Sequence, residues 1–310
     1  MIDLSGYSSA LQFADGLWTA AARNPVSYPG EGNAFCFQLE ETSFWFRHRN
    51  ACILAAARNH LQGGVIFDIG GGNGFVSRAL QAAGLTPVLV EPGPAGAANA
   101  LRRGVATVVR ATLEDAAFRP ESLPNAGLFD VLEHVGADAD FLGRVFALLR
   151  PGGRLLLTVP AHAWLWSDED AVAGHHRRYG RRDLTARLAG AGFEPRYVTG
   201  FFHFLVLPVL LGRALPARLG RRRRALDAAS HRSAHRSRGG PLGALVAALG
   251  RLEERRIARG GRIPFGSSLL AVARKPAWPE TKPGSGHQDT KARSRDSDKF
   301  GPVQNRPPAD

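Results

Sequence analysis

Short apolar runs alternate with helical patterns through the middle of the chain. Runs typical of buried strands lie at residues 65–69, 87–90, 105–109, 127–131, 154–159 and 193–199. Patterns typical of helices lie at residues 75–83, 138–149 and 181–191, and each ends near a glycine or a Pro-Gly-Gly turn. Strands separated by single helices predict an α/β fold, with a doubly wound, mostly parallel sheet covered on both faces.

The two ends of the chain and one late segment break this alternation. Residues 43–60 carry a helical pattern that Gly63 and Gly64 end, so we expect a helical lead-in. Residues 201–211 are almost wholly apolar but fall short of the roughly 20 residues that span a bilayer. The predicted organisation is a helical N-terminal segment at 1–62, a core at 63–200, an apolar and basic helical insertion at 201–262, the last strand of the core at 263–275 and a disordered tail at 276–310.

The composition is that of an ordinary globular protein. With 310 residues, 44% of them hydrophobic, the chain can bury one substantial core. Its two cysteines, Cys36 and Cys52, lie in no recognisable motif, which favours packing roles. No N-terminal stretch has the pattern of a signal peptide, so we expect a cytoplasmic protein.

The formal net charge of +13 is unusual, and much of it is local. Between Arg213 and Arg238 the only acid is Asp227, and residues 221–224 are four consecutive arginines. Together with the apolar run before it, this patch would suit a peripheral contact of residues 201–224 with the inner face of a membrane, which is one of two interpretations. The alternative is a buried helix over the sheet edge with solvated arginines. Nucleic acid is disfavoured, because no aromatic and basic motif or zinc module accompanies the patch.

Residues 68–74 read DIGGGNG between a predicted strand and a predicted helix. Glycines there let a ligand approach the backbone closely. A dinucleotide loop starting at Gly70 would need glycine or alanine where Phe75 stands. The loop instead fits D-x-G-x-G-x-G, with Asp68, Gly70, Gly72 and Gly74 at the required places. Here the sequence resembles the class I S-adenosylmethionine-dependent methyltransferases.

The resemblance implies a Rossmann-like, seven-stranded sheet with an antiparallel last strand, and S-adenosylmethionine as the cofactor. It covers residues 44–199 and returns at 266–276. Asp68 and the glycine loop would hold the amino-acid end of the cofactor, and Glu91, after the second strand, the ribose hydroxyls. An acid near the adenine is expected at Asp115, with Glu114 as the alternative.

Residues 129–134 read FDVLEH, which resembles the fourth-strand motif of the same family. Asp130 and His134 would lie at the carboxyl edge of the sheet beside the methyl group, where Asp130 contributes to cofactor binding and catalysis. His134 is the candidate general base, because the ordinary pKa of histidine lies near neutrality. The alternative for His134 is a cap or packing residue.

A second polar cluster follows the strand at 154–159. Loops at the carboxyl ends of strands build the ligand crevice of such sheets, so this cluster is predicted to contact the acceptor. A lid without substrate contact is the alternative. No metal is expected, because the adjacent histidines have no carboxylate or cysteine partner at ligand spacing. The candidate acceptor-binding residues are His175, His176, Arg177 and Tyr179.

The sequence therefore predicts an S-adenosylmethionine-dependent methyltransferase that acts on a small-molecule or lipid-linked acceptor by in-line transfer. Two other functions stay open. One is an RNA methyltransferase that uses the arginine patch for phosphates, and the other is a protein that binds the cofactor without catalysis.

Overall fold

The computed structural model describes residues 2–24, 37, 39–61, 63–220 and 240–277. Its sheet has nine strands in the order β1-β2-β5-β4-β3-β6-β7-β9-β8. The strands are β1 (Gln12–Ala14), β2 (Leu17–Thr19), β3 (Val65–Ile69), β4 (Thr86–Val90), β5 (Val108–Arg110), β6 (Leu123–Phe129), β7 (Leu149–Pro160), β8 (Glu194–Phe201) and β9 (Ser268–Arg274). All of them belong to one unit, Met1–Trp278.

The central strands confirm the predicted doubly wound sheet. Neighbours among β5, β4, β3, β6 and β7 pair in parallel, and β9 runs antiparallel to both β7 and β8. In β3, Asp68 stands opposite Leu89 of β4 and Gly127 of β6. The carboxyl ends of these three strands therefore meet at one edge, where ligands bind in open α/β sheets.

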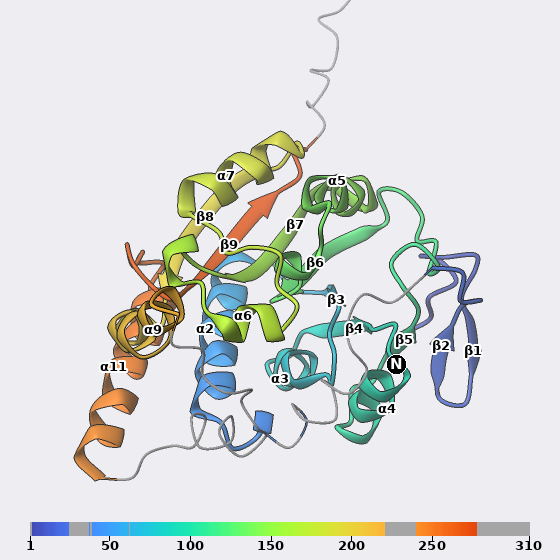
Figure 1. Ribbon diagram of the computed structural model, residues 1–310. Coiled ribbons are helices and arrows are strands. Elements are labelled where there is room, and N and C mark those ends of the chain that lie inside the picture. The colour runs from blue at the N-terminus through green and yellow to red at the C-terminus, as the bar shows by residue number, and fades with distance from the viewer. Residues whose placement is uncertain (1, 25–36, 38, 62, 221–239, 278–310) are drawn as a thin grey trace, which may run out of the picture. The chain divides into compact units, whose positions relative to one another are not determined.

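Helices cover both faces of the sheet (Figure 1). Helices α2 (Phe44–His60), α3 (Phe75–Ala82) and α11 (Gly240–Ala258) pack with sheet residues such as Ile66 in one apolar cluster. Helices α5 (Asp138–Leu148) and α7 (Arg181–Gly190) pack with Phe67 in the other. Successive strand residues thus serve opposite faces, as a sheet buried on both sides requires.

The N-terminal segment differs from the predicted helical lead-in. Helix α2, with Ser43 as N-cap, agrees with it, whereas β1 and β2 form a hairpin. Asp15 and Gly16 connect these strands with φ of 51° and 81°, as a two-residue Asp-Gly turn requires. Because β2 pairs in parallel with β5, the sheet has nine strands where seven were predicted.

Several core elements have other bounds than the sequence predicted. Helix α4 (Pro94–Arg102) was not predicted, and β5 begins at Val108 instead of residue 105. Strand β6 begins at Leu123, because residues 123–126 also pair, and Asn125 donates to the Val65 carbonyl at 3.1 Å. The Pro-Gly-Gly turn lies within β7, where a β-carbon on Gly153 would come within 2.8 Å of the Arg150 carbonyl.

The insertion between β8 and β9 is helical, as predicted. Its first part runs through η3 (His203–Leu205), α8 (Val206–Val209), η4 (Leu210–Ala214) and α9 (Leu215–Arg218), and α11 follows. The arginine run at 221–224, Cys36 and nearly all of the predicted disordered tail lie outside the described residues.

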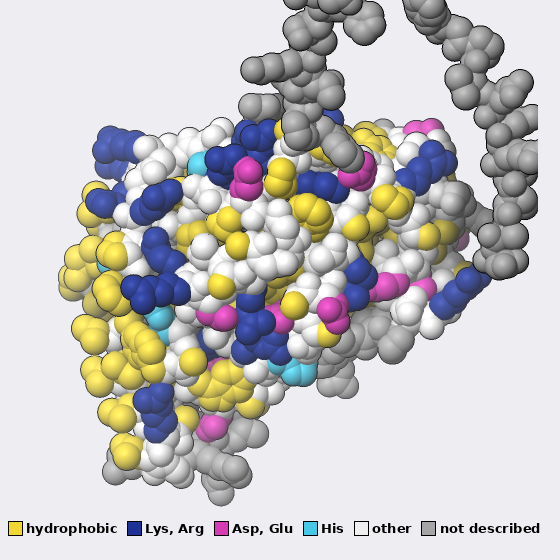
Figure 2. All heavy atoms as spheres, turned by 90° about the horizontal axis from the view of Figure 1, so that it is seen from above, with side chains coloured by type: hydrophobic (Ala, Val, Ile, Leu, Met, Phe, Trp, Pro, Cys, Tyr) yellow, Lys and Arg dark blue, Asp and Glu magenta, His cyan; other side chains and the backbone are white. Residues whose placement is uncertain are grey.

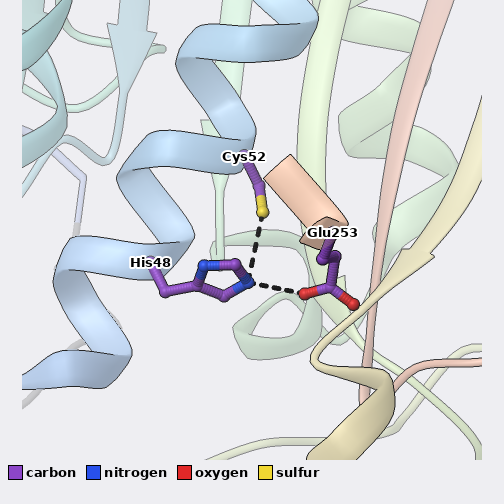
Figure 3. A group of neighbouring side chains, drawn as sticks. All are labelled: His48, Cys52 and Glu253. Carbon is purple, nitrogen blue, oxygen red and sulfur yellow. Dashed lines mark hydrogen bonds and ion pairs between the residues drawn. The ribbon is translucent and has the colours of Figure 1, made fainter. Parts of the chain in front are cut away.

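A buried carboxylate joins α11 to α2 (Figure 3). Glu253 of α11 accepts hydrogen bonds from His48 Nε2 of α2 at 2.5 Å and from the Phe202 backbone at 2.7 Å. Cys52 lies beside them, with its Sγ 3.5 Å from His48 Nε2. Burial raises the pKa of the Cys52 thiol well above its ordinary value, so at neutral pH it stays protonated, as the predicted packing role requires.

Candidate active site

The glycine loop joins β3 to the N-terminus of α3 in a conformation that needs glycine. Gly70, Gly72 and Gly74 have φ of 72°, 53° and 75°, in the left-handed region. A β-carbon on Gly70 would lie 2.8 Å from the side chain of Val131. The loop therefore presents bare backbone at the carboxyl edge of the sheet.

Asp68 stands behind this loop, almost fully buried. Its Oδ2 accepts a hydrogen bond from Ser77 Oγ at 2.6 Å, while its Oδ1 has no hydrogen-bond partner among the described residues. Burial raises the pKa of Asp68 to about 6. A buried oxygen without a partner is costly, so Asp68 suits a cationic group such as an ammonium.

Glu91 follows β4 and reaches back to the glycine loop. Its Oε2 accepts from the Gly72 backbone N–H at 2.9 Å, and its Oε1 from the Gly93 backbone N–H at 2.8 Å. Burial raises the pKa of Glu91, and the two backbone donors oppose that rise. Each oxygen keeps a lone pair that can accept a hydroxyl, which suits the predicted ribose contact.

The two acids predicted near the adenine bind other parts of the chain. Asp115 accepts from Asn24 Nδ2 at 2.7 Å and from the Arg23 backbone at 3.2 Å. Glu114 forms an ion pair with Arg144 at 3.1 Å on the surface. Neither geometry distinguishes the two, so their contact with adenine stays a prediction.

Asp130 lies just beyond β6 with φ of 58°, and its side chain reaches α2. There it forms an ion pair with Arg49, and its Oδ1 accepts from Thr158 Oγ1 at 3.0 Å. Arg49 is buried, and Trp45 stacks against it with the guanidinium 5.1 Å from the ring. The sequence prediction missed Arg49. The helical pattern of residues 43–60 indicates which face is buried but does not indicate that Arg49 pairs with Asp130.

His134 lies in the short helix η1 (Leu132–His134), which follows β6. Its ring centre is 4.8 Å from that of His175. Burial lowers the pKa of His134 to about 4, and His175 acts in the same direction. His134 is therefore neutral at pH 7 and can accept a proton, although a pKa this low makes it a weak base.

The predicted acceptor cluster separates into exposed and buried members. His176 is exposed, and His175 is partly exposed, with its Nδ1 2.9 Å from Asp170 Oδ1. Tyr179 is fully buried, and its hydroxyl donates to Asp138 Oδ2 at 2.9 Å, whereas a contact with the acceptor was predicted. Arg177 pairs with the same carboxylate at 2.6 Å. These two side chains thus hold the loop against η1 and α5, and the histidines remain as candidates for the acceptor.

Comparison with known proteins agrees with this arrangement. Residues 45–198 match a family described as methyltransferase domain. The chain is 25% identical over 186 residues to the probable S-adenosylmethionine-dependent methyltransferase of Mycolicibacterium smegmatis, covering 58% of this chain and 70% of that protein. It is 33% identical over 155 residues to an uncharacterized methyltransferase of Mycobacterium marinum, covering 48% of this chain and 56% of that protein.

Solved structures share the fold. One is the methyltransferase in a complex with the Haloferax volcanii Trm112 methyltransferase activator, with 17% identity, a TM-score of 0.52 and coverage of 80% of this chain and 96% of that chain. Another is Haemonchus contortus phosphoethanolamine N-methyltransferase 2 with S-adenosyl-L-methionine, with 18% identity, a TM-score of 0.51 and coverage of 81% and 58%. Both likenesses show the Rossmann-like methyltransferase fold.

Proposed function

We propose, on the premise that this chain belongs to the methyltransferase-domain family and is an S-adenosylmethionine-dependent methyltransferase, that it methylates a small-molecule or lipid-linked acceptor. The observation that supports the cofactor's position best is the hydrogen bond between Glu91 and the Gly72 backbone, beside Asp68 Oδ1, which has no hydrogen-bond partner in the part of the chain that the structure describes. Two buried carboxylates would repel a pyrophosphate, whereas they attract an ammonium and accept hydroxyl groups.

Each end of the cofactor then has a fitting side chain. S-adenosylmethionine, when bound, supplies an electrophilic methyl group on its sulfonium. Asp68 Oδ1 would pair with its ammonium, and the remaining lone pairs of Glu91 would accept the ribose hydroxyls. Arg49, held by Asp130 at the same edge, adds the positive charge that the cofactor's carboxylate needs. Asp130 thus acts by positioning Arg49.

Catalysis of methyl transfer is mainly alignment of acceptor, methyl carbon and sulfur. A carboxylate or an activated carbon acceptor needs no base. A hydroxyl acceptor does, and the neutral His134 would take its proton.

The acceptor side is built by the loop that follows β7. Part of the insertion packs on this loop: Arg213 of η4 forms an ion pair with Glu169 of α6 (Asp168–Val172), and Arg218 of α9 donates to the Trp164 carbonyl at 3.0 Å. Trp164 belongs to η2 (Ala163–Leu165). The insertion therefore stands beside the segment that carries His175.

The outer face of this insertion carries leucines in place of polar residues. Leu207, Leu211, Leu215 and Leu219 recur every fourth residue and are between 41% and 65% exposed. Figure 2 shows hydrophobic side chains gathered on one side of the molecule with Lys and Arg side chains among them. Apolar side chains bordered by cations suit an anionic membrane surface. Among the described residues no helix is both long and apolar enough to cross a membrane.

Residues 201–224 are therefore proposed as a peripheral membrane contact. A lipid-linked acceptor is favoured, because the exposed leucines of the insertion lie next to the loop that carries His175.

The test is label transfer from methyl-labelled S-adenosylmethionine to lipid and aqueous extracts of the source cells. Label in the lipid extract supports the proposal, label in small molecules of the aqueous extract points to a small-molecule acceptor, and label in no fraction, RNA included, contradicts catalysis. A variant with Glu91 changed to alanine is the control for non-enzymatic labelling.

An RNA methyltransferase would bind RNA with an affinity that depends on salt. Phosphate contacts make affinity fall steeply with salt. Tight RNA binding that weakens strongly between about 50 and 200 mM salt, together with label in RNA, would replace the lipid proposal.

A further inference from the structure

Three metal-ligating side chains converge beside the proposed acceptor site. Glu133 and His134 belong to η1, and His175 comes from the loop after α6. Each offers one ligand atom, and these atoms all lie within 4.8 Å of one another. One carboxylate and two imidazoles are a ligand set typical of Zn²⁺ and of other first-row divalent metals. The fold brings His175 next to Glu133 and His134, which lie some 40 residues earlier in the sequence.

The burial of Glu133 points independently to a cation ligand. The side chain is almost fully buried, and its Oε2 has no hydrogen-bond partner among the described residues. A carboxylate is not commonly buried without a partner, because its desolvation costs several kcal/mol. A cation bound at Oε2 would remove that cost.

His175 is oriented as metal-bound histidines are. Its Nδ1 lies 2.9 Å from Asp170 Oδ1, and Asp170 is itself held by Arg178 Nε at 2.8 Å and by the Ser167 backbone at 2.9 Å. A carboxylate at one ring nitrogen fixes the tautomer that leaves the other nitrogen, Nε2, as the ligand. Asp170 is thus a positioning residue for His175.

A second cluster of metal-ligating side chains has no carboxylate oxygen that needs a cation. His48, Cys52 and Glu253 also lie within ligand distance of one another (Figure 3). The Glu253 oxygens, however, already accept from His48, from the Phe202 backbone and from His203, whose backbone N is at 3.1 Å and whose Nδ1 is at 2.7 Å. A metal there would have to displace a satisfied network, so the cluster serves packing between α2 and α11.

We propose that Glu133, His134 and His175 bind one divalent transition-metal ion, with Zn²⁺ as the reference ligand. Three protein ligands leave at least one coordination position for water or for an oxygen of the acceptor. This last use rests on the proposed methyl transfer, whereas metal binding does not. When the metal is bound, His134 is a ligand and does not serve as the general base.

The experiment is equilibrium dialysis of the chelator-treated full chain against Zn²⁺, without cofactor or acceptor. We expect one equivalent of Zn²⁺ per chain. Glu133→Gln and His175→Ala should each weaken binding at least tenfold, and Asp170→Asn by about tenfold to a hundredfold. His176→Ala, in the exposed neighbour, and Cys52→Ser, in the second cluster, should leave the affinity unchanged. Thermal unfolding and S-adenosylmethionine binding verify that each variant folds.

Co²⁺ in place of Zn²⁺ reports which side chains coordinate. Nitrogen and oxygen ligands give visible bands without the intense near-ultraviolet band of a thiolate, so the expected spectrum lacks that band. Absence of stoichiometric Zn²⁺ binding, an affinity unchanged in both Glu133→Gln and His175→Ala, or a thiolate band lost in Cys52→Ser would each overturn the proposal. A metal that binds as expected while no methyl transfer is found would leave the site standing and remove only the proposed function.

Discussion

Glu91 Oε2 accepts a hydrogen bond from the Gly72 backbone at 2.9 Å, so the acid after the second core strand and the glycine loop after the first form one unit. The same carboxylate reaches Gly93 with its other oxygen, at 2.8 Å. Two backbone donors fix the carboxylate before any ligand arrives. A preoriented acceptor binds its ligand with less loss of side-chain entropy.

Changing Glu91 to alanine should weaken S-adenosylmethionine binding by about 1.5 to 3 kcal/mol, the range for hydrogen bonds to charged groups. Calorimetric titration measures the effect. Asp140→Ala, which removes an exposed acid of α5, is the matched control and should leave the affinity as it is. An affinity equal to that of the wild type would remove Glu91 from the ribose site.

Changing Gly72 to valine should abolish detectable cofactor binding while the domain stays folded. A β-branched residue is strained at a φ of 53°, and its side chain would occupy the surface that the ligand approaches. The control is Gly143→Ala in α5, where a β-carbon meets nothing within 4 Å. Retained affinity in the folded valine variant would contradict the position given to the cofactor.

Cofactor affinity should fall as the pH drops through about 6. Burial raises the pKa of Asp68 to about 6, so below that pH Asp68 is neutral and loses its attraction for the ammonium. Arg49 and Ser77 oppose this rise, and Glu91, whose own pKa is raised, is the other acid at the loop. Titrations from pH 5 to 8 measure the profile, and Asp68→Asn should bind weakly at every pH.

Asp68→Asn should also stabilise the cofactor-free protein against unfolding at neutral and higher pH. Asp68 has a higher pKa folded than unfolded, so its contribution to stability is present below about pH 4 and is lost as the pH rises through about 6. Asp68→Asn avoids that loss, which is up to about 3 kcal/mol for two pKa units. Denaturant unfolding at pH 4 and pH 8 measures the difference, and a variant less stable than the wild type at pH 8 would contradict the burial argument.

Replacing both Leu207 and Leu211 by aspartate should abolish sedimentation with vesicles that contain anionic lipid. The change places charge on the face proposed to meet the membrane and removes apolar area. Phe13→Asp, at an exposed phenylalanine of the β1–β2 hairpin, is the control and should sediment as the wild type does. Equal sedimentation of all three proteins would contradict a role for the insertion in docking.

Tyr179→Phe should cost about 1 kcal/mol of unfolding free energy and leave the KM for the acceptor unchanged. The buried hydroxyl donates to Asp138 Oδ2 at 2.9 Å and lies 3.1 Å from the Leu132 carbonyl, so its loss removes a buried donor and no surface contact. Chemical denaturation measures the first value and methyl-transfer kinetics the second. A raised KM with unchanged stability would restore the acceptor contact that the sequence predicted.

The sequence by itself determined the parallel core and the loop chemistry. Strand and helix patterns at residues 65–83 are local, and a left-handed glycine loop behind an aspartate needs no distant partner to be recognised. The adjacency of Glu91 to the loop also follows, because successive parallel strands end at the same edge. The local prediction missed the Asp15-Gly16 hairpin, although an Asp-Gly pair is itself a hairpin signal, and it also missed α4 and the early start of β6.

Only the tertiary structure decided which distant side chains meet. Arg49 and Asp130, Tyr179 and Asp138, and Glu133 and His175 are each joined by packing between elements far apart in the sequence. Such pairs leave no periodic signal in the sequence. Burial limits the polarity and size of each residue, but the sequence around one residue does not indicate which distant residue it contacts. Burial then shifts the pKa of Asp68 and of His134 away from the ordinary value of each residue type, and only the tertiary structure decides how deeply each side chain is buried.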